Sequence, residues 1–238
     1  MSPPAQNTSR PANEHAAGLA ALLLLADGRF PAGGYAHSGG LEPTVEAGQV
    51  HDVASLEAFL RGRATTAGLV AAGIAAAACG AVTDADLTRL TALHSELDAR
   101  MPSPAQRTTS RQLGRQLLRV LQKIRPDPRF EPLAGNPHQP VVLGAAAASF
   151  GLGRAEAAML ALHESIAGPA AAAVRLMSLN PFDTHACLVR VGGSLEELAE
   201  TAAGASFGDL DDLPAAGAPL LDLAAERHTT HDMRLFAS

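Results

Sequence analysis

The chain of 238 residues has no tryptophan and one tyrosine, and aromatic residues make up only 3% of it. Its core therefore cannot be filled mainly by rings. Hydrophobic residues nevertheless reach 47%, with a heavy excess of Ala and Leu, which favour helices and have little preference for strands. No two alternating apolar runs stand close enough to form a hairpin. The sequence therefore predicts an all-α fold, a single-domain bundle of about ten helices.

Cysteine and positive charge are also scarce. The two cysteines, Cys79 and Cys187, form no CxxC pair, which excludes a disulfide framework and a zinc knuckle and favours a reducing, cytoplasmic setting. The net charge of -6 argues against a general nucleic-acid binder or an anionic-membrane binder, because both need a positive field. No P-loop motif is present, so the chain is not a nucleotide hydrolase of that kind.

Two segments, the N-terminus and residues 64–83, could be mistaken for a signal peptide and a membrane span. The N-terminus lacks a basic leader followed by an apolar stretch, and we expect residues 1–13 to form a disordered tail. Residues 64–83 carry no charge and have roughly the length of a bilayer crossing. They consist mostly of Ala, Gly and Thr, with few of the residues that drive insertion, so we predict a buried central helix rather than a membrane helix bundle.

Start and stop signals divide the chain into helices. The strongest start is "SPAQ" at Ser103, which combines a serine N-cap, proline at the first helical position and glutamine three residues after the cap. This helix should end at Arg125, because two prolines follow. The other expected helices are Glu14–Ala26, one from Ser38 or Gly39, one capped by Asp52, 84–100, Val141–Phe150, 154–179 with a possible kink at Pro169, Phe182–Val191, one capped by a Ser194/Glu197 box, and Pro219–His228.

The stretch "GRFPAGGYAHSGGLE", residues 28–42, gathers several residue types used in catalysis. His37 and Ser38 are adjacent, however, and neighbouring side chains rarely face each other. No strand precedes the serine, as a nucleophile elbow requires. We interpret the glycines as turn formers, and His37 or Ser38 as a group that satisfies the amides at the next helix start.

The chain end offers a candidate metal pair. One helical turn would bring His228 and His231 together, but third and fourth ligands are missing, so a solvated helix end is favoured over a metal site. A small His-dependent metal-binding enzyme stays an alternative. His138, His163 and His185 have no partner at ligand spacing and are expected on the surface or satisfied in the core.

Cations recur every fourth residue along the proline-capped helix. The opposite, apolar face consists of Leu113, Leu117, Val120, Leu121 and Ile124. We call the row of cations the basic ridge. Its members are Arg107, Arg111, Arg115, Arg119 and Lys123, the last being the only lysine in the chain. An ordinary solvated face and a docking surface for an acidic protein partner are both open, since arginine is well suited to interfaces.

Five ordered blocks resemble the UreF family of urease accessory proteins. They are "LLADGRFPAGGYAHSGGLE", "SRQLGRQLLR" from Ser110, "HQPVVLGAAAASFGL" from His138, "AAVRL" from Ala172, and "APLLDLAAERHTTHDMRLFAS" at the end. The resemblance implies an all-helical, dimer-forming, non-enzymatic helper that holds no tight cofactor. It would bridge a urease-bound scaffold (UreD, also called UreH) and a nickel-carrying GTPase (UreG), which uses GTP, and so load nickel into apo-urease.

On this reading residues 14–228 are the helical domain, and residues 229–238 form a tail that orders when a partner covers Leu235 and Phe236. The candidate partner-binding residues are Tyr35, His37, Ser38, Glu42, Arg175, His228, Arg234, Leu235, Phe236 and the four arginines of the basic ridge. No catalytic or cofactor-binding residue is expected.

Overall fold

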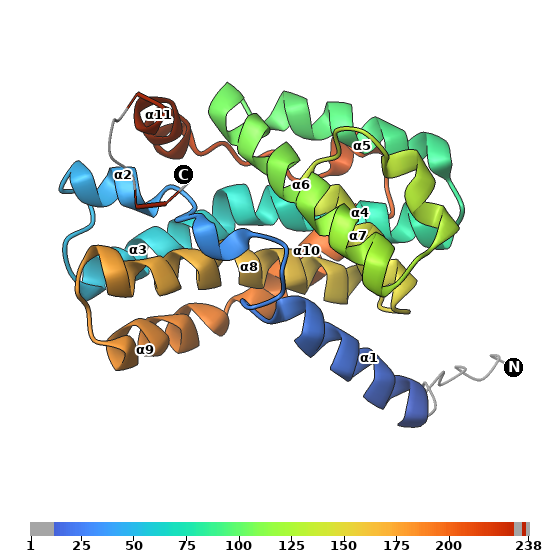
Figure 1. Ribbon diagram of the computed structural model, residues 1–238, viewed down its shortest axis with the longest axis horizontal. Coiled ribbons are helices and arrows are strands. Elements are labelled where there is room, and N and C mark those ends of the chain that lie inside the picture. Colours follow the sequence, from blue (N-terminus) through green and yellow to red (C-terminus); the bar gives the residue numbers. More distant parts are fainter. Residues whose placement is uncertain (1–11, 231–234, 237–238) are drawn as a thin grey trace, which may run out of the picture.

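The computed structural model describes residues 12–230 and 235–236, with side chains from residue 17 onward (Figure 1). Within these ranges the chain forms eleven α-helices and no strand, which confirms the predicted all-α class. The helices are α1 (Ala12–Ala26), α2 (Leu41–Glu46), α3 (Val53–Arg63), α4 (Leu69–Thr83), α5 (Leu87–Arg100), α6 (Pro104–Ile124), α7 (Gln139–Ser149), α8 (Arg154–Leu176), α9 (Pro181–Gly192), α10 (Leu195–Ala205) and α11 (Pro219–His228). A π-helical segment, Ala64–Gly68, joins α3 to α4, and short 3-10 turns lie at Gly34–Ala36, Pro128–Leu133 and Leu210–Asp212.

Helix α4 lies at the centre and packs against α7, α8, α10 and α5 (Figure 1). Every residue from Ala72 to Val82 is buried, and most of them are alanines or glycines. Small side chains let the helix backbones approach closely. At Gly144 of α7 a Cβ atom would overlap the carbonyl oxygen of Ala75 in α4. The scarcity of aromatic residues is therefore matched by a core of tightly packed small residues.

The continuous helix Val53–Thr83 and helix α8 are both long and apolar enough to cross a membrane, but 72% and 61% of their most apolar windows are buried inside the fold. Burial of this kind is typical of the central helices of a folded domain. The prediction of a buried helix for residues 64–83 is confirmed.

Local capping chemistry fixes several helix starts where the sequence predicted them. Asp52 and Ser55 form a reciprocal capping box at the start of α3, with Ser55 N donating to Asp52 Oδ1 over 2.8 Å. Ser103 Oγ accepts a hydrogen bond from Gln106 N at the start of α6, and Pro104 is the first helical residue. Helix α11 begins and ends at the predicted residues.

Other boundaries differ from the prediction. Helix α2 begins at Leu41 rather than at Ser38 or Gly39, because Gly39 and Gly40 have φ angles of 60° and 87°, which a helix cannot continue. Ser194 caps nothing with its side chain; its Oγ donates instead to Val191 O, and its own backbone is already helical. Helix α8 ends at Leu176, three residues early, just before Ser178 at φ 52°.

Candidate functional site

The segment of residues 28–43, which we call the signature segment, is shaped by glycines at its turns. Gly33 has a φ angle of 88°, as Gly40 does at 87°, and both values lie in the left-handed region. Ser38 is fully buried, and its Oγ accepts a hydrogen bond from Glu42 N at 3.2 Å. The serine therefore satisfies an amide in the first turn of α2, which confirms the structural interpretation of this residue.

The signature segment and the end of the chain meet at Glu42. Its carboxylate accepts hydrogen bonds from two consecutive backbone amides, Leu235 N at 2.7 Å and Phe236 N at 3.0 Å. His228 Nε2 lies 3.4 Å from the same carboxylate, and the Arg175 guanidinium lies 4.3 Å from the centre of the Phe236 ring. We call these five residues the clasp. They come from α2, α8, α11 and the chain end, and sequence reasoning nominated each of them without showing that they touch.

Three of the five clasp residues are buried. Glu42 is 3% exposed, His228 1% and Phe236 5%, whereas Leu235 is 67% exposed and points to solvent. Phe236 is thus held by the chain's own residues without a partner, and ordering of the remaining tail by a partner stays a prediction. His231 and Arg234 lie outside the described residues. No group of three His, Cys, Asp or Glu side chains suited to a metal ion occurs in the described part of the chain.

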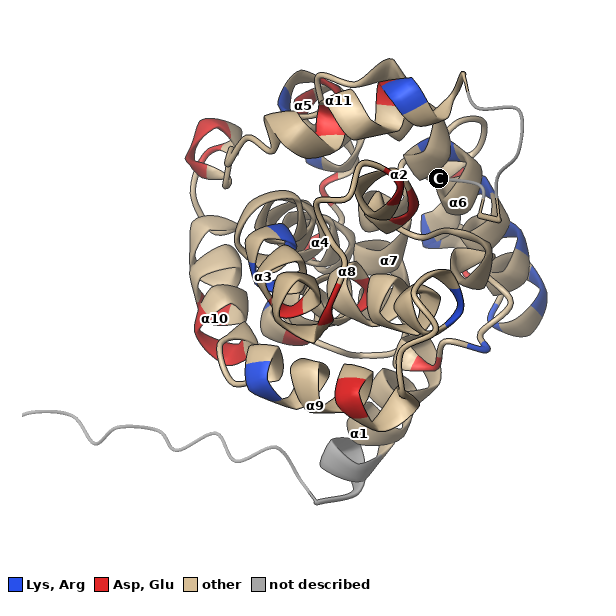
Figure 2. Ribbon diagram, turned by 90° about the vertical axis from the view of Figure 1, so that its left-hand side faces the viewer, with Lys and Arg blue, Asp and Glu red and all other residues tan. Residues whose placement is uncertain are grey.

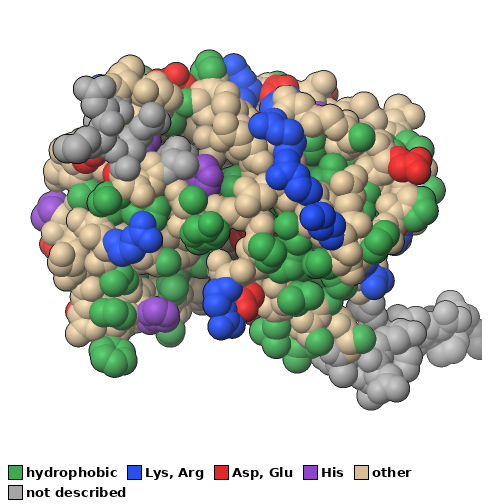
Figure 3. Space-filling model, in the orientation of Figure 1, with side chains coloured by type: hydrophobic (Ala, Val, Ile, Leu, Met, Phe, Trp, Pro, Cys, Tyr) green, Lys and Arg blue, Asp and Glu red, His purple; other side chains and the backbone are tan. Residues whose placement is uncertain are grey.

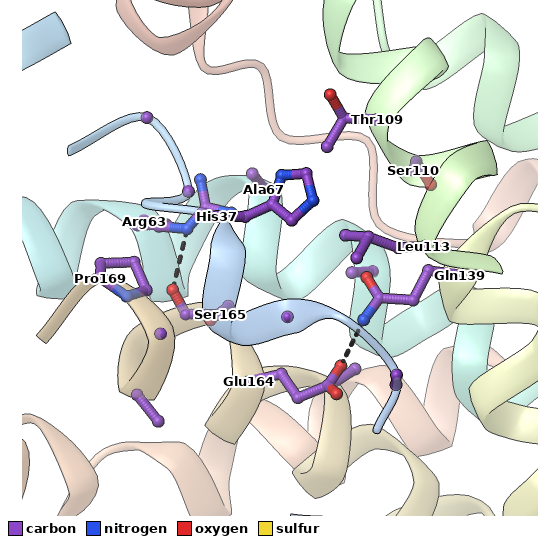
Figure 4. A pocket seen from close by; sticks show the side chains of 18 of the residues that line it. His37, Arg63, Ala67, Thr109, Ser110, Leu113, Gln139, Glu164, Ser165 and Pro169 are labelled. Atoms are coloured by element: carbon purple, nitrogen blue, oxygen red, sulfur yellow. Dashed lines mark hydrogen bonds between the residues drawn. The ribbon is translucent and has the colours of Figure 1, made fainter. Parts of the chain in front are cut away.

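A second contact links the signature segment to the turn of α8 that contains Pro169. Pro169 has no N–H, so the carbonyl of Ser165 loses its intrahelical donor. Arg63 Nε, beside the π-helical segment, donates to this carbonyl at 2.8 Å (Figure 4). A Cβ at Gly39 would lie 3.0 Å from Pro169 and 3.3 Å from the Arg63 guanidinium carbon, so the signature segment packs closely on both. Burial lowers the pKa of Arg63 to about 10.

Sequence reasoning missed Arg63. The only signal was Pro169 inside a helix, which predicts an orphaned carbonyl but does not say which side chain reaches it.

A cavity of about 570 Å³ lies beneath the signature segment, between α6, α7, α8, α11 and Phe236. His37, Arg63 and Glu164 line it together with apolar side chains (Figure 4). Burial lowers the pKa of His37. Tyr35 also lines the cavity and is 70% exposed.

The basic ridge divides into two halves. Arg107 donates to the carbonyls of Met101 and Pro102, and Arg111 pairs with Asp98 at 2.5 Å, so these two side chains hold the fold together. Arg115 is exposed, bonded to the side chain of Asn136, and Arg119 and Lys123 are exposed. Figure 2 shows several blue segments around α6, and Figure 3 shows a row of basic side chains across one face of the molecule.

The apolar side of α6 also differs in part from the prediction. Leu117 and Leu121 are buried, but Ile124 at the end of the helix is 54% exposed.

His138 is satisfied in the core, in agreement with its sequence interpretation. Its Nδ1 lies 3.0 Å from Ser110 Oγ and its Nε2 lies 3.0 Å from Asp98 Oδ1. The ring of His94 packs beside it, and burial together with the His138 charge lowers the pKa of His94 to about 4. This network ties α5, α6 and the start of α7, and it shares Asp98 with Arg111.

Comparison with known proteins identifies the family of this chain. Residues 50–192 match the sequence profile of the UreF family. The chain is 40% identical over 223 residues to the urease accessory protein UreF of Mycobacterium tuberculosis strain H37Rv, an alignment that covers 92% of this chain and 99% of that protein. The UreF proteins of Mycolicibacterium vanbaalenii and Mycobacterium sp. strain JLS are 39% and 41% identical over 228 and 221 residues, with the same coverage. These matches place the chain in the UreF family of urease accessory proteins.

Proposed function

We propose that this chain is the non-enzymatic, cytoplasmic adaptor of a urease maturation complex. It binds the urease-bound scaffold protein, UreD or UreH, and the nickel-carrying GTPase, UreG, and acts on apo-urease through them. Nickel is the cargo of the complex, and GTP is bound by the partner GTPase rather than by this chain. Nucleic acid and membrane are not among its partners.

The observation that best supports this role is the clasp. It joins the signature segment to the C-terminal block. The two hydrogen bonds that the Glu42 carboxylate accepts link residues 193 and 194 positions apart in the chain. Leu235, a member of the clasp, is 67% exposed, and Tyr35, which lines the same cavity as Phe236, is 70% exposed. Exposed apolar groups on a rigid support are typical of a protein-docking surface. We assign this surface to the scaffold protein.

An adaptor needs a second surface, and the exposed half of the basic ridge is suited to that task. Arg115, Arg119 and Lys123 form no ion pair within the described residues. Unpaired cations on a chain of net charge -6 would attract an acidic patch and raise the association rate.

A second copy of the chain is a further expected partner. Helix α1 extends from the body of the molecule (Figure 1), and three of its leucines, Leu19, Leu23 and Leu24, are 53%, 64% and 46% exposed. Such a face is more stable when covered, and we propose that a homodimer covers it.

The mechanism of an adaptor is differential binding. If the chain binds the GTP-loaded and the GTP-free partner with different affinities, nucleotide turnover changes the stability of the whole complex and thereby couples turnover to nickel release. No bond is made or broken by this chain.

The test of this proposal is the nickel content of urease from a strain that lacks the gene. Urease purified from that strain should contain its subunits but little nickel, and the wild-type gene supplied in trans should restore the metal. Fully nickel-loaded urease in the deletion strain would refute the proposal.

A further inference from the structure

The cavity beneath the signature segment has the size and lining of a small-molecule site. Its volume of about 570 Å³ lies within the range of roughly 300–1,000 Å³ that is usual for such sites. Its walls are mainly apolar side chains, including Phe30, Leu113 and Leu143, with a few polar groups among them. Figure 3 shows that this face of the molecule is hollowed near its centre.

One charged group in the cavity is Glu164. Gln139 Nε2 donates to its Oε2 at 2.9 Å (Figure 4). Its Oε1 accepts no hydrogen bond, and no Lys or Arg lies within 4 Å of the carboxylate, in the part of the chain that the structure describes. Burial raises the pKa of Glu164 to about 7, as expected for a carboxyl group removed from water without a cationic partner. This acceptor faces open cavity space and is suited to a cation.

The opposite charge is carried by Arg63. Its Nε is occupied by Ser165 O, but its two terminal nitrogens bind nothing within residues 12–230 and 235–236. His37 lines the cavity beside it, and Figure 4 shows Arg63 and His37 toward one side of the space and Glu164 and Gln139 toward the other. A planar guanidinium with free donors is the group that best matches a carboxylate.

We propose that this cavity binds a small zwitterionic organic molecule, with its cationic group at Glu164 and its anionic group at Arg63. An apolar stem of such a ligand would lie along the Leu113 and Leu143 walls. Such a ligand pairs with two half-buried, oppositely charged groups at once, which neither a simple cation nor a simple anion does.

This inference does not rest on the adaptor role, because Glu164 and Arg63 belong to neither the clasp nor the basic ridge, although His228 and Phe236 of the clasp line another part of the same cavity.

Three ligands of matched length test the proposal on the full chain: 6-aminohexanoate, hexanoate and hexylamine. We expect one molecule of 6-aminohexanoate to bind per chain in a calorimetric titration. Hexanoate and hexylamine should each bind about tenfold more weakly, the loss expected for one charge-assisted contact. No saturable binding of 6-aminohexanoate up to about 10 mM, or equal binding of all three, would overturn the proposal.

Variants locate the site. Glu164→Gln should weaken 6-aminohexanoate about tenfold and leave hexanoate unchanged. Arg63→Gln should weaken both ligands, and Glu197→Gln, an exposed change on α10, should affect neither. Because the three-ligand comparison uses the unaltered protein, the proposal remains testable even if Arg63→Gln fails to fold. Unchanged binding of 6-aminohexanoate to the Glu164→Gln variant would also overturn it.

Discussion

Replacing Glu42 with Gln should release the end of the chain from the fold. The carboxylate accepts two backbone hydrogen bonds, at 2.7 and 3.0 Å, from Leu235 and Phe236. Bonds to a charged acceptor are worth about 1.5–3 kcal/mol each, and an amide keeps only one acceptor oxygen and no charge. We therefore expect the clasp to lose about 2–3 kcal/mol, which is a factor of roughly 30 to 150 in its closing equilibrium.

Hydrogen exchange of the Leu235 and Phe236 amides measures this equilibrium directly, because only the open clasp exposes them. Both amides should exchange faster in Glu42→Gln by about the factor above, while the amides of the buried helix α4 should not change. Glu131→Gln, an exposed change elsewhere, serves as the matched control. Equal exchange at Leu235 and Phe236 in the variant and the wild type would refute the assignment of Glu42 as their acceptor.

Four further outcomes are expected. Deleting the chain from Thr229 onward should weaken scaffold binding in a titration, because it removes the exposed Leu235 and the buried Phe236. Charge reversal at Arg115 and Arg119 should weaken binding of one partner protein, increasingly so at low salt. Glu164→Gln should stabilise the fold at pH 8, by at most about 3 kcal/mol, and have little effect at pH 4. Gly144→Ala should lower the free energy of unfolding by about 1–3 kcal/mol in urea titrations, because the added methyl overlaps the Ala75 carbonyl.

The sign of the Glu164 effect follows from the direction of its shift. Its pKa is about 7 in the folded chain and near 4.5 in the unfolded chain, so the folded state holds the proton more tightly. Stability therefore falls as the pH rises from about 4.5 to 7, and a neutral amide removes this loss. A variant and wild type with parallel stability curves between pH 4 and 8 would contradict the assignment.

Charge reversal should avoid Arg111. This residue pairs with Asp98, and Asp98 also binds His138, so its loss would disturb the fold as well as any docking surface. Unchanged affinity of the Arg115 and Arg119 variant for both partners would show that the basic ridge is an ordinary solvated face. Unchanged scaffold affinity after the truncation would contradict the first prediction. An unchanged free energy of unfolding in Gly144→Ala would contradict the last.

The parts of the fold that the sequence predicted well are those decided by neighbouring residues. Asp52 and Ser103 start helices because a cap acts on the amides of the next three residues, which a sequence displays directly. Ser194 has the same pattern but fails as a cap, because its preceding turn already places its backbone in the helical region. A local pattern cannot reveal that competition.

The site was predictable in its members but not in its contacts. Glu42, His228 and Phe236 were nominated through family resemblance, and only the fold shows that they touch one another across most of the chain. Arg63 and Glu164 carried no signal at all, because neither belongs to a motif and both owe their properties to burial. Long-range contacts and desolvation are decided by packing, which spacing along the chain does not encode.

The central claim, that this chain joins two partner proteins, is tested most directly by size-exclusion chromatography with light scattering. The chain is mixed first with its cognate scaffold protein and then with the GTPase and a non-hydrolysable GTP analogue. The account predicts a stepwise increase in mass, with both partners present in one complex of defined stoichiometry only when this chain is included. If this chain elutes alone under every condition while the partners are shown to be folded and nucleotide-competent, the adaptor role is contradicted.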